Sequence, residues 1–309
     1  MRTDSSATGG PSAGPQPRRR FGGLRLGYWP LALAIAVVTG CTAIPPASPP
    51  GSHALPTTRD FHADLHEVLQ RFVDDDGLVD YPALAADRTA LDRYYALVAA
   101  VSPETHPAQF PTEHDRLAYW LNAYNAAVLT AVLQYYPIAS VRDVRPPTAL
   151  FFLPRLSGFF LFQRITLGGR TMSLLHLEND IVRARFGEPR IHFALNCASA
   201  SCPRLPRTAF TGASLEAELE REARRFMADA RNVRIDLATR RIELSPIFDW
   251  YEDDYLDWLA VHAPDAPHTL SAYVARYAPA TQAAALRACA DCTVTFAPYD
   301  WSLNDRSAR

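Results

Sequence analysis

The spacing of apolar and polar side chains predicts a mostly helical chain. In several stretches apolar residues recur every three or four positions, the spacing of a helix that buries one face. These stretches are residues 61–73, 91–101, 113–135, 174–186 and 215–228, with two or three further helices expected across residues 253–289. Ser173 stands directly before the fourth stretch, where an N-terminal cap is expected.

Shorter stretches alternate between apolar and polar residues, as half-buried strands do. Gly168-Gly169 follows a predicted strand at 160–167 and indicates a hairpin turn, and residues 190–196 alternate in the same way. Residues 233–236 and 241–245 are predicted to form a second hairpin, and residues 293–296 a last strand. The prediction is an α+β fold: one helix-rich domain over residues 58–309, with a small, at least partly antiparallel sheet.

The first forty residues have the pattern of an export signal. Arg18-Arg19-Arg20 precedes an apolar run at 28–39, which is short for a membrane span and has the length of a signal-peptide core. The run ends in Val38-Thr39-Gly40-Cys41, which resembles a lipobox. We expect residues 1–40 to be a signal peptide and Cys41 to be lipidated. Ordinary secretion with an unmodified Cys41 is the alternative.

The segment after the signal is rich in proline and serine and cannot build a core. Residues 41–57 are therefore predicted to be the lipidated cysteine and a tether, which makes the membrane a partner through Cys41. Thr42, rather than an aspartate, follows Cys41. By resemblance to lipoprotein sorting, this favours the outer membrane and places the domain on the periplasmic face of the cell envelope.

Charge and composition exclude several functions. The formal net charge is −2. All 31 basic residues are arginines, and the absence of lysine excludes Schiff-base chemistry on a lysine and a phosphate-loop lysine. The sequence has no basic stripe of the kind that indicates nucleic-acid binding, so no nucleic-acid partner is predicted. No G-x-G-x-x-G motif opens a helix after a strand, and no cofactor is predicted.

Four sequence motifs, taken in their order along the chain, closely resemble the family known as domain of unknown function 547. They are AYWLNAYNA at 118–126, SLLHLE at 173–178, RIHFALNCASASCP at 190–203 and LSPIFDWY at 244–251. The ending YDWSLN at 299–304 fits as well. The resemblance is firm over residues 85–255 and looser over 61–309. It implies an exported bacterial protein without the leucine zipper of plant members, and it implies no particular reaction.

The predicted strand at 190–196 would align three polar side chains on one face: Arg190, His192 and Asn196. Cys197 follows where the strand ends. The small side chains around Ser199 and Ser201 allow a tight loop whose backbone N–H groups could bind an anion. An unknown small molecule or peptide is the expected ligand.

Polar residues on apolar helix faces complete the candidate site. Glu178 lies on the buried stripe of the helix at 174–186, where a carboxylate needs a partner, and Arg190 or His192 is the expected one. Asn125 sits on the buried stripe of the long helix, with Asn122 one turn before it. Such buried amides must be hydrogen-bonded, as ligand contacts or as parts of the core.

Two classes of function follow. In the first, Cys197 or Cys202 is the nucleophile of a hydrolase or acyl-transfer enzyme acting on peptide, amide or thiol substrates. His192 is its base, Glu178 orients the base, and the asparagines complete the polar shell.

In the second, the protein is a non-catalytic ligand-binding or scaffolding lipoprotein in which Cys197–Cys202 is a structural disulfide. Zinc bound by His192 and both cysteines lacks an adjacent fourth ligand, so no metal is predicted. Cys289 and Cys292 are expected to form a short structural disulfide.

Overall fold

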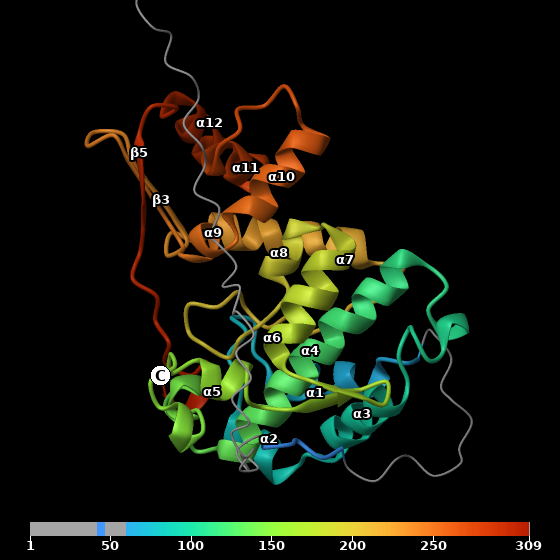
Figure 1. The fold of residues 1–309 in the computed structure, drawn as a ribbon. Coiled ribbons are helices and arrows are strands. Elements are labelled where there is room, and N and C mark those ends of the chain that lie inside the picture. The colour runs from blue at the N-terminus through green and yellow to red at the C-terminus, as the bar shows by residue number, and fades with distance from the viewer. Residues whose placement is uncertain (1–41, 47–59, 309) are drawn as a thin grey trace, which may run out of the picture. The chain divides into compact units, whose positions relative to one another are not determined.

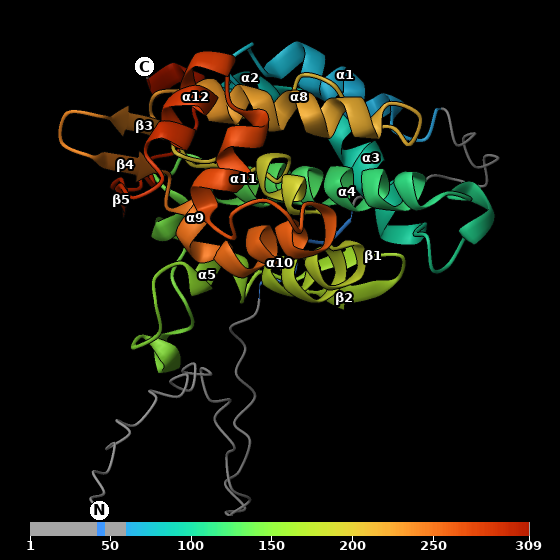
Figure 2. The same cartoon turned by 90° about the horizontal axis from the view of Figure 1, so that it is seen from above.

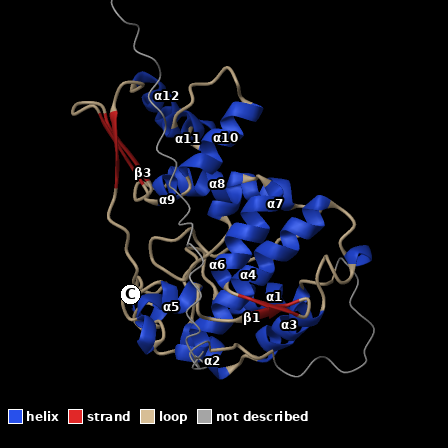
Figure 3. Cartoon of the chain, viewed as in Figure 1, coloured by secondary structure: helices blue, strands red, loops and turns tan. Residues whose placement is uncertain are grey.

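The computed structural model describes residues 42–46 and 60–308. The predicted signal peptide, Cys41, and residues 47–57 of the predicted tether lie outside the described residues. No helix in the described part of the chain is long and apolar enough to cross a membrane. The fold is helix-rich α+β, as predicted, with two small sheets (Figures 1 and 3).

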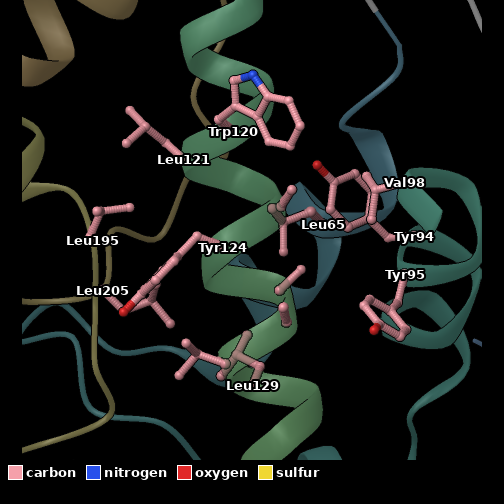
Figure 4. Packing of buried hydrophobic residues seen from close by; sticks show 14 of the residues in the cluster. Leu65, Tyr94, Tyr95, Val98, Trp120, Leu121, Tyr124, Leu129, Leu195 and Leu205 are labelled. Atoms are coloured by element: carbon pink, nitrogen blue, oxygen red, sulfur yellow. The ribbon is translucent and has the colours of Figure 1, made fainter. Parts of the chain in front are cut away.

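The longest helix, α4 (Glu113–Tyr135), is the centre of the first hydrophobic core. Thr112 caps it in a capping box with Asp115. The sequence pattern predicted one buried stripe, but residues 117–133 are buried all round because α3 (Thr89–Ala100) and other segments enclose the helix. Helix α1 (Ala63–Phe72) packs against α3. Figure 4 shows this packing, with Tyr124 projecting toward Leu195 and Leu205. The short helix α2 (Tyr81–Ala86) packs against α1.

The second core lies between the C-terminal helices and a three-stranded sheet. The helices are α9 (Ile247–Trp250), α10 (Glu252–His262), α11 (Leu270–Tyr277) and α12 (Ala280–Ala288). In the sheet β3 (Val233–Asp236) pairs antiparallel with β4 (Arg241–Leu244), and β4 pairs parallel with β5 (Thr293–Phe296). Helix α8 (Leu215–Ala228) joins the cores, because Leu219 packs in the first and Phe226 in the second.

A small hairpin and an irregular helix lie between α4 and α8. The hairpin of β1 (Ile165–Leu167) and β2 (Arg170–Met172) turns at Gly168-Gly169, both with positive φ, as predicted. The predicted strand start at residue 160 is wrong, because α5 (Ser157–Phe160) occupies that stretch. Helix 174–186 is capped by Ser173 and consists of α6 (Leu174–His176), the π-helix η4 (Leu177–Arg183) and α7 (Ala184–Phe186).

The predicted strand at 190–196 is wrong. Its first part is a 3-10 helix, η5 (Pro189–Phe193), and residues 189–196 are all buried. Pro189 suits the first turn of a helix, and Glu188 caps it by accepting the N–H of Arg190. Because this segment packs against α8, α10 and η4, both of its faces are buried, and alternation does not reveal a strand here. The other short 3-10 helices are η1 (Pro107–Gln109), η2 (Val141–Asp143), η3 (Thr148–Leu150) and η6 (Arg306–Ala308).

The C-terminal segment returns from β5 to the loop that contains both candidate cysteines (Figure 1). Ser199 and Leu303 form an antiparallel bridge, and the N–H of Asn304 donates to the carbonyl of Ala198 at 3.2 Å. Tyr81 from α2 donates its hydroxyl to the Asn304 side chain at 2.8 Å. Residues of α2 and of the C-terminal segment therefore hold the cysteine loop in place.

Candidate functional site

An apolar pocket of about 540 Å³ lies beside the cysteine loop. Its walls come from α4, from residues 153–161, from η4 and η5, and from α9 and the C-terminal segment. The structure brings the four predicted catalytic side chains to this pocket: Glu178, His192, Cys197 and Cys202. On the other side of the cysteine loop lies a second, more polar cavity of about 450 Å³, which shares Cys202 and Pro203 with the first.

Cys197 is a free, partly buried thiol surrounded by hydrogen-bond donors. Its Sγ lies 3.1 Å from Oγ of Ser199 and 3.3 Å from the hydroxyl of Tyr299. Burial alone would raise the pKa of Cys197, but hydrogen bonds from Cys202, Ser199 and Tyr299 outweigh burial and lower it. The surroundings therefore favour the Cys197 thiolate.

Cys202 is also free, and it is the proton-holding member of the pair. Its Sγ lies 2.8 Å from the backbone nitrogen of Cys197. Burial and the neighbouring charge of Cys197 raise the pKa of Cys202 well above its usual value. The structural disulfide Cys197–Cys202 of the second hypothesis is not formed in the structure.

The loop after Cys197 turns through a strained residue. Ala198 is fully buried with φ of 60°, in the left-handed region that residues with a side chain rarely adopt. The backbone N–H groups of Ala198, Ala200, Ser201 and Cys202 donate to oxygens of the protein. These four groups are not available to an external anion, so the predicted anion-binding loop is wrong for them.

His192 is buried, and its Nε2 lies 2.7 Å from Oδ2 of Asp254 on α10. Burial lowers the pKa of His192, although the carboxylate of Asp254 opposes this shift. A neutral imidazole that donates from Nε2 leaves Nδ1 as an acceptor, which is the form a general base needs. Within the described residues no hydrogen bond joins His192 to either thiol.

Glu178 does not orient His192 and does not pair with Arg190, contrary to both expectations. Its carboxylate accepts the hydroxyl of Tyr124 at 3.1 Å and a very short hydrogen bond from Tyr251. Burial and the charge of Glu178 raise the pKa of both tyrosines, so they remain neutral donors. Glu178 lies in a π-helix, a geometry that is frequent at functional sites.

Arg190 points away from the pocket. It makes ion pairs with Glu188 and with Glu216 of α8, each at 2.7 Å. Burial lowers its pKa, but the hydrogen bonds with these two carboxylates raise it further, so Arg190 stays charged. In a 3-10 helix, with three residues per turn, Arg190 and His192 cannot share one face as they would in a strand.

The predicted binding asparagines are bound to the protein itself. Asn125 donates to the carbonyl of Ala194 at 3.0 Å and accepts the N–H of Asn196 at 2.9 Å. Asn122 makes the same two-way contact with the backbone of Phe210. These amides therefore hold backbone segments of the protein together. The side chain of Asn196 does the same for the cysteine loop, because it accepts the N–H of Ala198 and donates to the carbonyl of Pro203.

Ser199 faces Cys197 and Tyr299, whereas Ser201 accepts the N–H of Asp300 at 2.9 Å. Of the two serines predicted to bind ligand, only Ser199 thus contacts the Cys197 thiol, and Ser201 fastens the loop to the C-terminal segment.

Several site residues come from parts of the chain that sequence reasoning did not connect with the cysteines. Tyr299 contacts Cys197, and Asp254 binds His192. Tyr251 stacks on the His192 ring with a centroid separation of 3.8 Å. An aromatic-Asp-aromatic motif occurs at both 248–250 and 299–301, and this repeat was the sequence signal that could have connected these two segments. Trp250 and Trp301 from the two motifs stack in the pocket wall.

Two further predictions concern the cysteines and metals. Cys289 and Cys292 form the expected disulfide. Within residues 42–46 and 60–308, no group of three or more His, Cys, Asp or Glu side chains is arranged to hold a metal ion.

Comparison with known proteins supports the family resemblance. Residues 108–227 match the family described as "Protein of unknown function, DUF547", which confirms the resemblance over this stretch. The match runs from before α4 into α8 and includes Glu178, His192 and both pocket cysteines. Tyr251, Asp254 and Tyr299 lie beyond it. No curated protein and no solved structure matches the chain.

Proposed function

We propose that this chain, with its domain of unknown function 547, is a cysteine-dependent hydrolase or acyl-transfer enzyme whose nucleophile is Cys197. One observation carries the proposal: Cys197 meets the hydroxyls of Ser199 and Tyr299 at 3.1 and 3.3 Å beside an open apolar pocket. Hydrogen bonds to the sulfur favour the thiolate, and the thiolate is the reactive form of cysteine.

The proposed reaction has two steps. The Cys197 thiolate attacks the carbonyl carbon of an acyl substrate, a C–S bond forms, and the bond to the leaving group breaks as that group departs with a proton from solvent. A water or another acceptor then attacks the thioester, Nδ1 of His192 takes its proton, and Cys197 leaves as thiolate. Asp254 keeps Nε2 of His192 protonated, so Nδ1 remains the acceptor.

The pocket indicates which part of the substrate it holds. Its wall is aromatic and aliphatic, including Trp250, Trp301, Phe160 and Leu161. An apolar acyl group therefore fits better than a charged one, because a charge would lose its hydration there. The hydroxyls of Ser199 and Tyr299 are the donors closest to the carbonyl oxygen of a thioester on Cys197.

A binding protein without catalysis is the second candidate, and the position of Cys202 favours it. Cys202 Sγ lies against the backbone nitrogen of Cys197, so an oxidant can join the two sulfurs with release of two protons and two electrons to that oxidant. In the oxidised form the pocket would hold an apolar ligand without reacting.

We also propose that the protein is exported and anchored through a lipid on Cys41, with its domain in the periplasm at the outer membrane. The leader and the lipobox-like ending support this from sequence alone. The disulfide Cys289–Cys292 adds support, because disulfides persist in oxidising compartments.

Alkylation and acylation of the purified protein test the catalytic proposal. With reductant-free protein, iodoacetamide should modify Cys197 well before Cys202 at neutral pH. A chromogenic p-nitrophenyl octanoate ester should leave an acyl adduct on the Cys197 peptide in mass spectra. Cys197→Ser should abolish adduct and hydrolysis, while Cys202→Ser, the matched control, keeps both. If only a Cys197–Cys202 disulfide is found after mild reduction, the binding-protein candidate is favoured instead.

A further inference from the structure

Residues 142–164, which we name the aromatic-basic segment, carry the most exposed aromatic side chains described. Phe151 and Phe152 are 81% and 69% exposed and lie edge to face, with ring centroids 6.2 Å apart. Leu161, at the end of the same segment, is 38% exposed. In Figure 2 the green chain before α5 projects away from its neighbours. Neighbouring exposed apolar side chains of this size mark an interaction surface.

The charges of this segment are almost all positive. It holds four arginines and a single acidic residue, Asp143, whose carboxylate accepts the N–H groups of Ala139 and Ser140. Arg145 and Arg155 are exposed on either side of the phenylalanines and form no ion pair with any described residue. Arginine beside exposed phenylalanine is the composition of a surface that enters the headgroup region of an anionic bilayer.

The same segment forms one wall of the pocket. Leu153, Leu156, Phe160 and Leu161 line the same cavity as Cys197. A bilayer that receives Phe151 and Phe152 would therefore lie next to the apolar entrance of the pocket.

The start of the described chain is fastened to the end of this segment. The N–H of Arg164 donates to the carbonyl of Thr42 at 3.0 Å, and the N–H of Ile44 donates to the carbonyl of Arg164 at 2.8 Å. Ile44 is buried, with 3% of its surface exposed. Residues 42–46 therefore lie beside the end of the aromatic-basic segment.

We propose that the aromatic-basic segment docks on an anionic lipid bilayer, with Phe151 and Phe152 among the acyl chains and the arginines at the headgroups. The pocket then opens at the membrane surface, and its substrate is an acyl chain that enters from the bilayer as part of an amphiphile. The substrate clause rests on the proposed function of Cys197. The docking surface stands on its own geometry.

Vesicle binding by the full chain carrying Cys41→Ser tests the docking without an attached lipid. Phosphatidylethanolamine vesicles with phosphatidylglycerol should slow hydrogen exchange across residues 148–162, a local signal that the leader does not produce. Phe151→Ser with Phe152→Ser should weaken vesicle binding by roughly 10- to 100-fold, since two buried phenyl groups are lost. Arg145→Gln with Arg155→Gln should weaken it roughly tenfold, and only for anionic vesicles.

Val261→Ser on α10 is the matched control, because Val261 is 73% exposed and lies outside the segment. It should leave vesicle binding unchanged. The docking proposal is overturned if exchange at 148–162 does not slow with anionic vesicles, or if it slows only with rising protein concentration, which would indicate self-association. Cys197 alkylation, measured on the same Cys41→Ser chain as vesicle binding, separates the two proposals: vesicle binding with no reactive thiol would end the enzyme proposal and leave the docking surface intact.

Discussion

Replacing Tyr299 by phenylalanine removes one hydroxyl from Cys197 and keeps the ring. The hydroxyl lies 3.3 Å from the Cys197 sulfur and 3.0 Å from the Ser199 oxygen, so its loss leaves the thiolate with fewer donors. The aromatic contacts with Trp250 and Trp301 depend on the ring and should survive. We therefore expect the pKa of Cys197 to rise in Tyr299→Phe without loss of the fold.

The size of the effect follows from the energy of one hydrogen bond to a charged group. Such a bond contributes about 1.5–3 kcal/mol, which corresponds to a rise of about one to two pKa units for Cys197. The thiolate fraction below the pKa then falls by about 10- to 100-fold. A more basic thiolate is also intrinsically about 3- to 10-fold more nucleophilic, since the Brønsted slope is about 0.4–0.5. The net alkylation rate at neutral pH should fall by about 3- to 10-fold.

The assay is the pH dependence of iodoacetamide alkylation at Cys197, followed by peptide mass spectrometry. In the wild type the rate should reach its plateau at lower pH than in Tyr299→Phe. Because the variant thiolate is the stronger nucleophile, its plateau should be higher, and the two curves should cross. Tyr251→Phe is the matched control, since its hydroxyl binds Glu178 rather than the thiol.

Crossing curves with a shifted midpoint would be difficult to explain by a structural defect, which lowers or raises accessibility at every pH. An unchanged midpoint in Tyr299→Phe would refute the reasoning, because it would mean that the hydroxyl does not stabilise the thiolate. The same shift in Tyr251→Phe would show that the effect is not specific to the Tyr299 contact.

Two further predictions concern residues near the cysteine loop, and a third concerns His62 at the start of α1. Asn125→Ala should lower the free energy of unfolding in urea by about 2–4 kcal/mol, because two buried backbone groups lose their partner. Asp254→Asn should weaken the base more than the nucleophile, so the acyl adduct on Cys197 should accumulate in mass spectra. Burial lowers the pKa of His62 from 6.5 to about 3, so its neutral form stabilises the fold above pH 6.5 and this contribution is lost as pH falls toward 3. His62→Gln should flatten that acid slope of stability, which is at most about 1.4 kcal/mol per pH unit for one proton.

The helices and the hairpins were predictable because their signals are local. The bounds of α4 agree with the spacing of its apolar residues, and Gly168-Gly169 marks the turn of the first hairpin. The strand predicted at 190–196 is wrong because alternation of apolar and polar residues indicates a strand only when one face is exposed, and residues 190–196 are all buried. Where α8, α10 and η4 cover the segment, only Pro189 and the cap at Glu188 indicate a helical turn.

The members of the candidate site were partly predictable, but their partners were not. The motifs at 173–178 and 190–203 that resemble the family contain Glu178, His192, Cys197 and Cys202. The fold brings these four side chains to one pocket. The partner of His192 lies 62 positions further along the chain, and the phenol beside Cys197 lies 102 positions beyond it. Periodicity carries no information on such separations, so the predicted partner of His192, Glu178, was the wrong one.

The arrangement of Glu178 explains how a thiolate and a carboxylate can share one apolar pocket. Two anions without shielding would raise the pKa of each other. Here Tyr251 donates to Glu178 and at the same time stacks on His192. Tyr124 takes the second carboxylate oxygen. Glu178, which lies in a π-helix, thus binds both phenols, while Cys197 contacts Ser199 and Tyr299. The carboxylate and the thiol thus contact different phenols, and no hydrogen bond to Nδ1 of His192 is found among the described residues.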